Sequence, residues 1–227
     1  MNLSKLYSNR FSQTEALKRR RMWEAINGAF LRKYVHRDDT VLDIAAGSCE
    51  FINTITCAED SSVHPRRRIA VDCNPDMKLS AEAGVITYCQ SATDMSNIPD
   101  NSVDVAFTSN FFEHLSRESI LSVLTECYRV LRGGGGCLLI LQPNFRFAYK
   151  NYWDFFDHIT PLTDRSLSEA ILMSGEKFRI EEMIPQFLPY TTKSRLPQAP
   201  WLIRLYLRVS VAWPLLGKQL FCVVRKD

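Results

Sequence analysis

The chain has 227 residues, which is enough for one large domain or for one domain with an appendage. With 46% hydrophobic and 23% charged residues, its composition excludes a disordered tail, a collagen-like rod and a polytopic membrane protein. The formal net charge is only +3, but Lys and Arg outnumber the acids nine to two in residues 1–37 and seven to one in residues 190–227, so an acidic centre lies between two basic ends.

The first 37 residues predict an N-terminal helical cap, because apolar residues recur at helical intervals over residues 14–34. A basic run at residues 18–21 lies on this helix. We interpret it as a solvated face, with contact to nucleic acid or acidic lipid as the alternative. The first residues contain no apolar stretch of the signal-peptide type, and the seven cysteines without a C-x-x-C pair are typical of reduced thiols. We therefore expect a cytoplasmic protein.

From residue 40 onward, short β-branched and apolar runs alternate with helical stretches. We expect strands at residues 40–45, 68–72, 85–90, 103–109, 137–143, 178–184 and 219–225. We expect helices after residue 48, after residue 75, and at residues 118–131 and 163–174. The first five of these strands are apolar throughout rather than alternating, as expected when helices cover both faces of a parallel sheet. The pattern therefore predicts a doubly wound α/β fold.

A run of four glycines, residues 133–136, separates the predicted helix at 118–131 from the strand at 137–143. A phosphate-binding glycine loop leads into the N-terminus of a helix, whereas these glycines end a helix and begin a strand. We interpret the run as a turn that stops the helix.

Residues 41–51, VLDIAAGSCEF, combine a buried strand, an acid and a run of small residues that leads into a helix. The acid is Asp43, and the small residues Ala45 and Gly47 let the backbone approach a ligand closely at the carboxyl edge of the strand. The next strand ends at Asp72, whose carboxylate is placed to accept hydrogen bonds from a ribose diol. The pattern predicts a nucleoside-containing ligand at a topological switch point without naming it.

Further segments follow that resemble one enzyme family. They are Ser91-Ala92 with IPDNSVD at 98–104, SNFFEHL at 109–115, and RVLR at 129–132 before the glycine run. With the motif at 41–51 and the acid at 72, they resemble class I S-adenosylmethionine-dependent methyltransferases over about residues 38–185. The resemblance implies a mostly parallel, seven-stranded Rossmann-like sheet with an antiparallel last strand and helices on both faces. It also implies S-adenosylmethionine (SAM) as the cofactor, bound by Tyr7, Asp43, Ala45, Gly47, Asp72, Cys73, Ser91, Ala92 and Asn110.

The glycine motif departs from the family pattern at two positions. Ala45 and Cys49 stand where the family has its first and third glycine, and Ser91 replaces a common acid on the adenine side. Alanine fits the first position if its φ is negative, whereas a cysteine at the third position is expected to place a side chain near the cofactor. A non-catalytic SAM-binding relative is therefore the main alternative to an enzyme.

In-line methyl transfer needs proximity, alignment and exclusion of water, and a hydroxyl acceptor also needs a base for its proton. His114 and the pair Asp157-His158 are the candidate catalytic residues, because they follow the fourth and fifth strands. A structural or cofactor-side role is the alternative for His114, since Glu-His-Leu recurs across the family. The aromatic segment at 152–158 either lines an acceptor pocket or belongs to the core. No metal site is expected, because no His pair has zinc-type spacing.

The acceptor is indicated by a weaker resemblance. Residues 157–167 and Gly217-Lys218-Gln219 resemble a bacterial branch linked to polysaccharide or cell-surface biosynthesis, which implies methylation of a hydroxyl, or an amine, of a small or glycan-type acceptor. The two basic ends favour an anionic acceptor or peripheral contact with an anionic membrane. RNA is the third choice as acceptor, and no contact with DNA is expected.

These observations divide the chain into the cap at residues 1–37 and a methyltransferase domain at residues 38–227. Within that domain, the basic and aromatic residues at about 188–217 are expected to form a lid over the acceptor. The alternatives are a segment that contacts anionic lipid and a helix that packs on the domain or on a partner subunit. The oligomeric state is left open.

Overall fold

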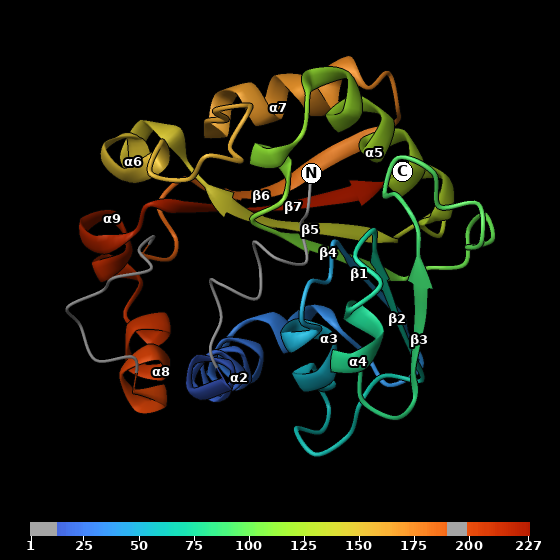
Figure 1. The fold of residues 1–227 in the computed structure, drawn as a ribbon, viewed down its shortest axis with the longest axis horizontal. Coiled ribbons are helices and arrows are strands. Elements are labelled where there is room, and N and C mark those ends of the chain that lie inside the picture. Colours follow the sequence, from blue (N-terminus) through green and yellow to red (C-terminus); the bar gives the residue numbers. More distant parts are fainter. Residues whose placement is uncertain (1–12, 190–198) are drawn as a thin grey trace. The chain divides into compact units, whose positions relative to one another are not determined.

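The computed structural model describes residues 13–189 and 199–227 (Figure 1). Its strands are β1 (Thr40–Ile44), β2 (Arg67–Asp72), β3 (Val85–Cys89), β4 (Val105–Ser109), β5 (Cys137–Pro143), β6 (Phe178–Ile184) and β7 (Gln219–Lys226). Within the described residues they form one mixed sheet in the order β3-β2-β1-β4-β5-β7-β6, and β7 runs antiparallel to both of its neighbours. The predicted fold class is therefore confirmed, and the bounds of β5 and β6 are those predicted.

The helices are α2 (Gln13–Ala29), η1 (Leu31–Tyr34), α3 (Glu50–Thr54), α4 (Met77–Ser80), η2 (Phe112–His114), α5 (Arg117–Val130), α6 (Phe145–Tyr152), α7 (Asp164–Met173), α8 (Pro200–Arg208), η3 (Ser210–Ala212) and α9 (Trp213–Leu216). Among the residues that the structure describes, none of these helices has the length and apolar character that a membrane crossing requires.

The chain divides into two compact units. The first contains the described residues up to Gln90 together with residues 199–209, and the second contains residues 91–189 and the chain from Ser210 onward. The N-terminal cap and the lid at about 188–217 stay predictions, and residues 190–198 of that segment lie outside the described part of the chain.

In the first unit, β1, β2 and β3 pair in parallel, and all five residues of β1 are buried. This burial explains the continuous apolar run that marks β1 in the sequence. α2 lies beside α8 and also contacts α3 (Figure 1). α2 ends at Ala29 and not at Tyr34 as predicted, because Phe30 leaves the helical conformation with φ −136° and its side chain is buried.

The basic run at residues 18–21 is partly used inside the first unit. The Nε atom of Arg19 lies 2.7 Å from the Glu50 carboxylate, and Arg20 forms an ion pair with Glu82. The other two basic side chains of the run are exposed. The run is therefore a solvated face only in part, since two of its charges tie α2 to α3 and to the residues after α4.

In the second unit, β4 and β5 pair in parallel, and β7 lies antiparallel between β5 and β6. All seven residues of β5 are buried. α5 and α7 contact each other, and α7 packs against β6 (Figure 1). The two helices begin at the side-chain caps Ser116 and Thr163. The glycine run at 133–136 forms the predicted turn between α5 and β5.

The sequence pattern did not predict α6. Asn144 caps this helix directly after β5, because its side-chain oxygen accepts a hydrogen bond from the backbone N–H of Arg146. The amide nitrogen of Asn144 donates to the Asp164 carboxylate and to the Pro185 carbonyl, both at 2.9 Å. One buried side chain thus ties the start of α6 to α7 and to the residue after β6.

Candidate functional site

The glycine motif forms the turn between β1 and α3 in the first unit. Ala45, Gly47 and Cys49 all adopt the left-handed conformation, with φ of 57°, 54° and 59°. The condition under which alanine fits the first position, a negative φ, is therefore not met. For a residue with a Cβ, this conformation costs roughly 1–2 kcal/mol, so the loop holds two strained residues where glycine would be relaxed. Such strain persists where surrounding contacts impose it.

Contacts with the end of β2 hold this turn in place. The backbone N–H of Ala46 donates to the Val71 carbonyl at 3.0 Å, and that of Gly47 donates to Asp72 Oδ2 at 2.8 Å. The other carboxylate oxygen of Asp72 accepts from the backbone N–H of Asn74 at 2.7 Å. A carboxylate has about four acceptor positions, so Asp72 retains capacity for hydroxyl donors. The predicted ribose contact therefore fits this geometry.

Cys49 does not project from the turn as expected. Its side chain is fully buried in the first unit, and Sγ lies 3.7 Å from the Met77 carbonyl, to which it donates. Burial, together with the charges of Asp43, Glu50 and Asp72, raises the pKa of the Cys49 thiol to about 12. The thiol is therefore neutral at physiological pH and acts as a small apolar side chain.

Asp43 is the buried acid of the motif. Desolvation by burial, and then the charge of Glu50, raise the pKa of Asp43 well above its usual value. Its Oδ2 atom is buried without a hydrogen-bond partner among the described residues. A positively charged ligand close to this carboxyl would favour its ionised form. The residues of the motif therefore fit a cationic cofactor such as SAM.

The other predicted cofactor residues are held by local contacts. Cys73, next to Asp72, is exposed. In the second unit, the Ser91 hydroxyl bonds the side chain of Thr93 at 2.8 Å, and Ala92 is buried. Asn110 follows β4 with φ 48°, and its side-chain oxygen accepts from Gln219 at 2.7 Å. Their cofactor roles stay predictions, and Tyr7 lies outside the described residues.

The second unit brings the three predicted catalytic residues together. His114 belongs to η2, whereas Asp157 and His158 lie in the loop after α6. The backbone carbonyl of Glu113 accepts from the N–H of Ile159 at 2.7 Å, which joins these two segments. His114 Nδ1 lies 3.0 Å from the carbonyl oxygen of Asp157 and 3.5 Å from its Oδ2 atom. The centres of the two histidine rings are 5.0 Å apart.

The contact with Asp157 determines what His114 can do. When Nδ1–H donates to the Asp157 carbonyl, the lone pair of the ring lies on Nε2. The side chain of His114 is 24% exposed, whereas the carboxylate of Asp157 is buried. His114 can therefore accept a proton at Nε2, and the nearby carboxylate would stabilise the resulting imidazolium.

The aromatic segment at 152–158 is partly core and partly surface. Tyr152 is fully buried, and its hydroxyl donates to the Thr160 carbonyl at 2.7 Å. The ring of Phe155 stacks on His158 with 5.0 Å between centres. Trp153 and Phe156 are exposed, the latter by 96%. The Asp157-His158 pair does not cap the next helix, because Thr163 has that role.

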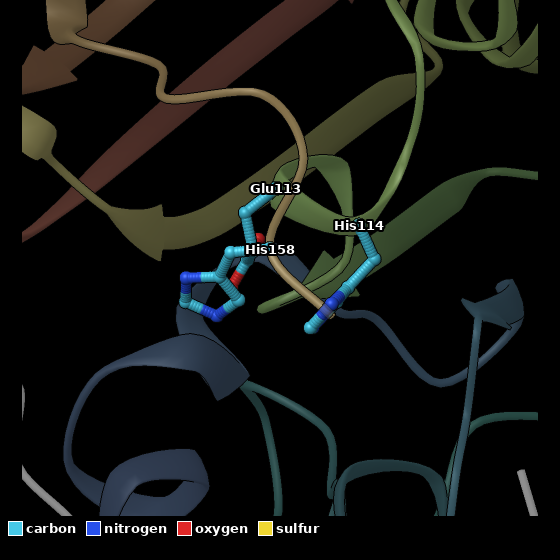
Figure 2. A group of neighbouring side chains, drawn as sticks. All are labelled: Glu113, His114 and His158. Carbon is cyan, nitrogen blue, oxygen red and sulfur yellow. The ribbon is translucent and has the colours of Figure 1, made fainter. Parts of the chain in front are cut away.

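Glu113 is a buried acid in the same cluster that the sequence reasoning did not single out. Its carboxylate lies beside the ring of His158 (Figure 2). Neither carboxylate oxygen has a hydrogen-bond partner on another described residue. Desolvation by burial raises the pKa of Glu113 to about 8, although its own backbone amide acts in the opposite direction. The only signal for it in the sequence is its place directly before His114.

Comparison with known proteins identifies the central region. Residues 42–139 match the family described as "Methyltransferase domain". No curated protein matches the chain. Among solved structures, a SAM-dependent methyltransferase from Archaeoglobus fulgidus is 21% identical, with a TM-score of 0.63 and coverage of 92% of this chain and 94% of that one.

Two further neighbours show how widely the fold is used. A geranyl diphosphate C-methyltransferase from Streptomyces coelicolor A3(2) is 13% identical, with a TM-score of 0.56 and coverage of 89% of this chain and 77% of that one. The [4+2]-cyclase SpnF is 16% identical, with a TM-score of 0.60 and coverage of 90% of this chain and 80% of that one. The family model covers less than half of the chain, and the structural neighbours show that the chain shares the fold of SAM-dependent methyltransferases. They leave the acceptor open, because the fold alone does not determine the reaction.

Proposed function

We propose that the protein is a SAM-dependent methyltransferase that acts on a hydroxyl, or an amine, of a small or glycan-type acceptor. The observation that carries this proposal is the contact between His114 Nδ1 and the carbonyl of Asp157. It orients a histidine whose second nitrogen is available for a proton. His114 follows the carboxyl end of β4, where ligands bind in open α/β sheets, and Asp157 lies in the loop after α6.

The residues of the first unit have the cofactor role in this proposal. When bound, SAM supplies a methyl group activated by its sulfonium. Asp72 accepts hydrogen bonds from the ribose hydroxyls while it holds the backbone of Gly47 and Asn74. Asp43 supplies a negative charge that a cationic ligand stabilises.

His114 removes the proton of a hydroxyl acceptor. Proton transfer to Nε2 produces an imidazolium whose Nδ1–H remains bound to the Asp157 carbonyl, and the Asp157 carboxylate at 3.5 Å compensates its charge. An amine acceptor needs only to arrive unprotonated, and His114 then serves to orient it.

Exposed aromatic side chains support a glycan-type acceptor. Tyr149 and Trp153 on and after α6 are each more than half exposed, and Phe156 is almost fully exposed. Exposed apolar surface often marks binding sites, and flat aromatic faces suit the apolar faces of sugar rings. The resemblance of residues 157–167 to enzymes of polysaccharide or cell-surface biosynthesis points to the same class of acceptor.

A calorimetric titration with SAM, followed by incubation with methyl-labelled SAM and a set of nucleotide-linked and lipid-linked sugars, tests the proposal. We expect saturable heat, a rise in melting temperature and label in at least one sugar. No heat and no thermal shift with SAM would contradict the proposal.

The alternative is a non-catalytic SAM-binding relative. The two strained positions in the glycine motif favour it, because substitutions at Ala45 and Cys49 carry a conformational cost that an active site must offset. Saturable heat with SAM, without label in any of the sugars or in RNA, would support this alternative. RNA as the methyl acceptor is suggested by the basic ends of the chain. This support is weaker in the structure, because Arg19 and Arg20 form ion pairs within the protein.

We further propose that the protein is cytoplasmic and that α8 brings it into peripheral contact with an anionic membrane. Trp201, Arg204, Leu205 and Arg208 are exposed and recur at helical spacing on one face of α8. The R204Q/R208Q variant should bind vesicles of anionic phospholipid at least roughly tenfold more weakly at low salt. The matched control R66Q/K78Q removes two exposed charges elsewhere in the first unit and should bind like the wild type. Equal binding by both variants in co-sedimentation would contradict the role of α8.

A further inference from the structure

We propose that Glu113, His114 and His158 form a binding site for a divalent transition-metal cation. Each of the three offers one donor atom, and these atoms all lie within 4.8 Å of one another (Figure 2). Metal–ligand bonds of about 2.0–2.2 Å place neighbouring donors roughly 3–3.5 Å apart. Small side-chain rotations therefore suffice to bring the three donors onto one ion.

The Glu113 carboxyl gives an independent reason to expect a ligand. Its side chain is 2% exposed, and neither oxygen has a hydrogen-bond partner on another described residue. Most buried polar atoms in proteins are satisfied, so two orphaned oxygens in one side chain call for a partner. A cation between this carboxylate and the two imidazoles would satisfy both the charge and the coordination.

The surroundings of His114 match those of a metal-binding histidine. Such residues usually donate their second ring N–H to a backbone carbonyl or a carboxylate, which fixes the tautomer and the ring orientation. Here the Asp157 carbonyl lies 3.0 Å from Nδ1 of His114, and the Asp157 carboxylate lies 3.5 Å from it. Asp157 is thus a positioning residue, and the lone pair of the His114 ring is left for the ion.

The donor set indicates the class of metal. Two imidazoles and one carboxylate favour Zn²⁺ and its neighbours Co²⁺, Fe²⁺ and Mn²⁺, whereas Mg²⁺ and Ca²⁺ prefer oxygen donors alone. Three protein ligands also leave a coordination position open. Only the use of that position rests on the proposed function: there the ion would bind and orient the acceptor oxygen. In the metal-bound form His114 is a ligand and cannot act as a base. The effect of added cation on the rate of methyl transfer therefore distinguishes the role of His114 as a metal ligand from its role as a base.

The sequence gives no indication of this site, because its ligands do not have zinc-type spacing. His114 and His158 are brought together by contacts between η2 and the loop after α6, among them the hydrogen bonds to the Glu113 carbonyl and the contact of His114 with the Asp157 carbonyl. The proposal therefore differs from the expectation that the protein has no metal site, and the following titrations decide between the two.

Titration of the whole chain with Co²⁺, followed by visible absorption, and with Zn²⁺, followed by calorimetry, tests the proposal. We expect one equivalent of either ion to bind. E113Q keeps the shape of the buried side chain, and H158Q removes one imidazole; each should weaken binding at least about a hundredfold. D157N keeps the backbone carbonyl and should weaken it only about tenfold. Circular dichroism and melting temperature establish that each variant is folded.

H36Q is the matched control, because His36 lies 2.6 Å from Glu59 on the surface of the first unit and forms the kind of pair that binds metals adventitiously. This variant should bind Co²⁺ like the wild type. No binding by the wild type, or an equal loss in H36Q and E113Q, would overturn the proposal. SAM binding measured on the same samples distinguishes the failure of the metal site from the failure of the proposed function. Binding heat with SAM but not with the metal ions contradicts the metal site alone. Binding heat with the metal ions but not with SAM contradicts the proposed function alone.

Discussion

Replacement of His114 by glutamine is expected to lower kcat for methyl transfer to a hydroxyl by about 10²–10⁴-fold. Glutamine has nearly the same reach, but it cannot accept a proton from the acceptor. The Kd for SAM should change by less than about threefold, because His114 is not among the residues predicted to bind the cofactor. The rate is measured as label transferred from methyl-labelled SAM to the acceptor under single-turnover conditions.

H64Q is the control for this substitution. The ring of His64 also bonds a backbone carbonyl, that of Ile55 at 2.6 Å, but it has no part in the proposed site. We expect its kcat to be close to that of the wild type. If H114Q raises KM and leaves kcat unchanged, His114 contributes only to binding and is not the base.

The architecture could be predicted from the sequence because it rests on local and periodic signals. β5 and β6 have the predicted bounds, since a continuous apolar run and a short amphipathic run each end at turn residues. β4 begins two residues later than predicted, at Val105, because Val103 forms only an isolated bridge with Leu131. α6 was not predicted, because its start depends on contacts of Asn144 with residues far along the chain.

The candidate site could be predicted less completely. The motif at 41–51 and the acid at 72 lie at the ends of adjacent strands, so their proximity follows from the order of β1 and β2. The place of Glu113 in the cluster could not be predicted, because Ile159 and Thr160, which donate to its backbone carbonyl, lie far along the chain. The conformation of Ala45 and Cys49 was also inaccessible, because both residues adopt a backbone conformation that their own side chains disfavour.

The strain in the motif makes the contacts of Asp72 more important. A turn with left-handed residues at 45, 47 and 49 keeps its shape only while neighbouring groups impose it. Asp72 accepts hydrogen bonds from the backbone of Gly47, in the turn after β1, and of Asn74, directly after β2. The same carboxylate is the proposed partner of the ribose, so in the proposed function Asp72 both orients the turn and binds the cofactor.

Replacement of Asp72 by alanine is therefore expected to raise the Kd for SAM about a hundredfold. Hydrogen bonds to a charged group contribute about 1.5–3 kcal/mol each, and a hundredfold change in Kd corresponds to about 2.7 kcal/mol.

D72N retains one acceptor oxygen, so its Kd for SAM should lie between those of D72A and the wild type. D76A removes an exposed acid four residues further along the first unit and should bind SAM like the wild type. Calorimetry gives the Kd values, and melting temperatures without SAM show how much of the loss comes from the turn itself. If D72A melts below the wild type yet binds SAM equally well, Asp72 supports only the turn, and the ribose contact must be assigned elsewhere.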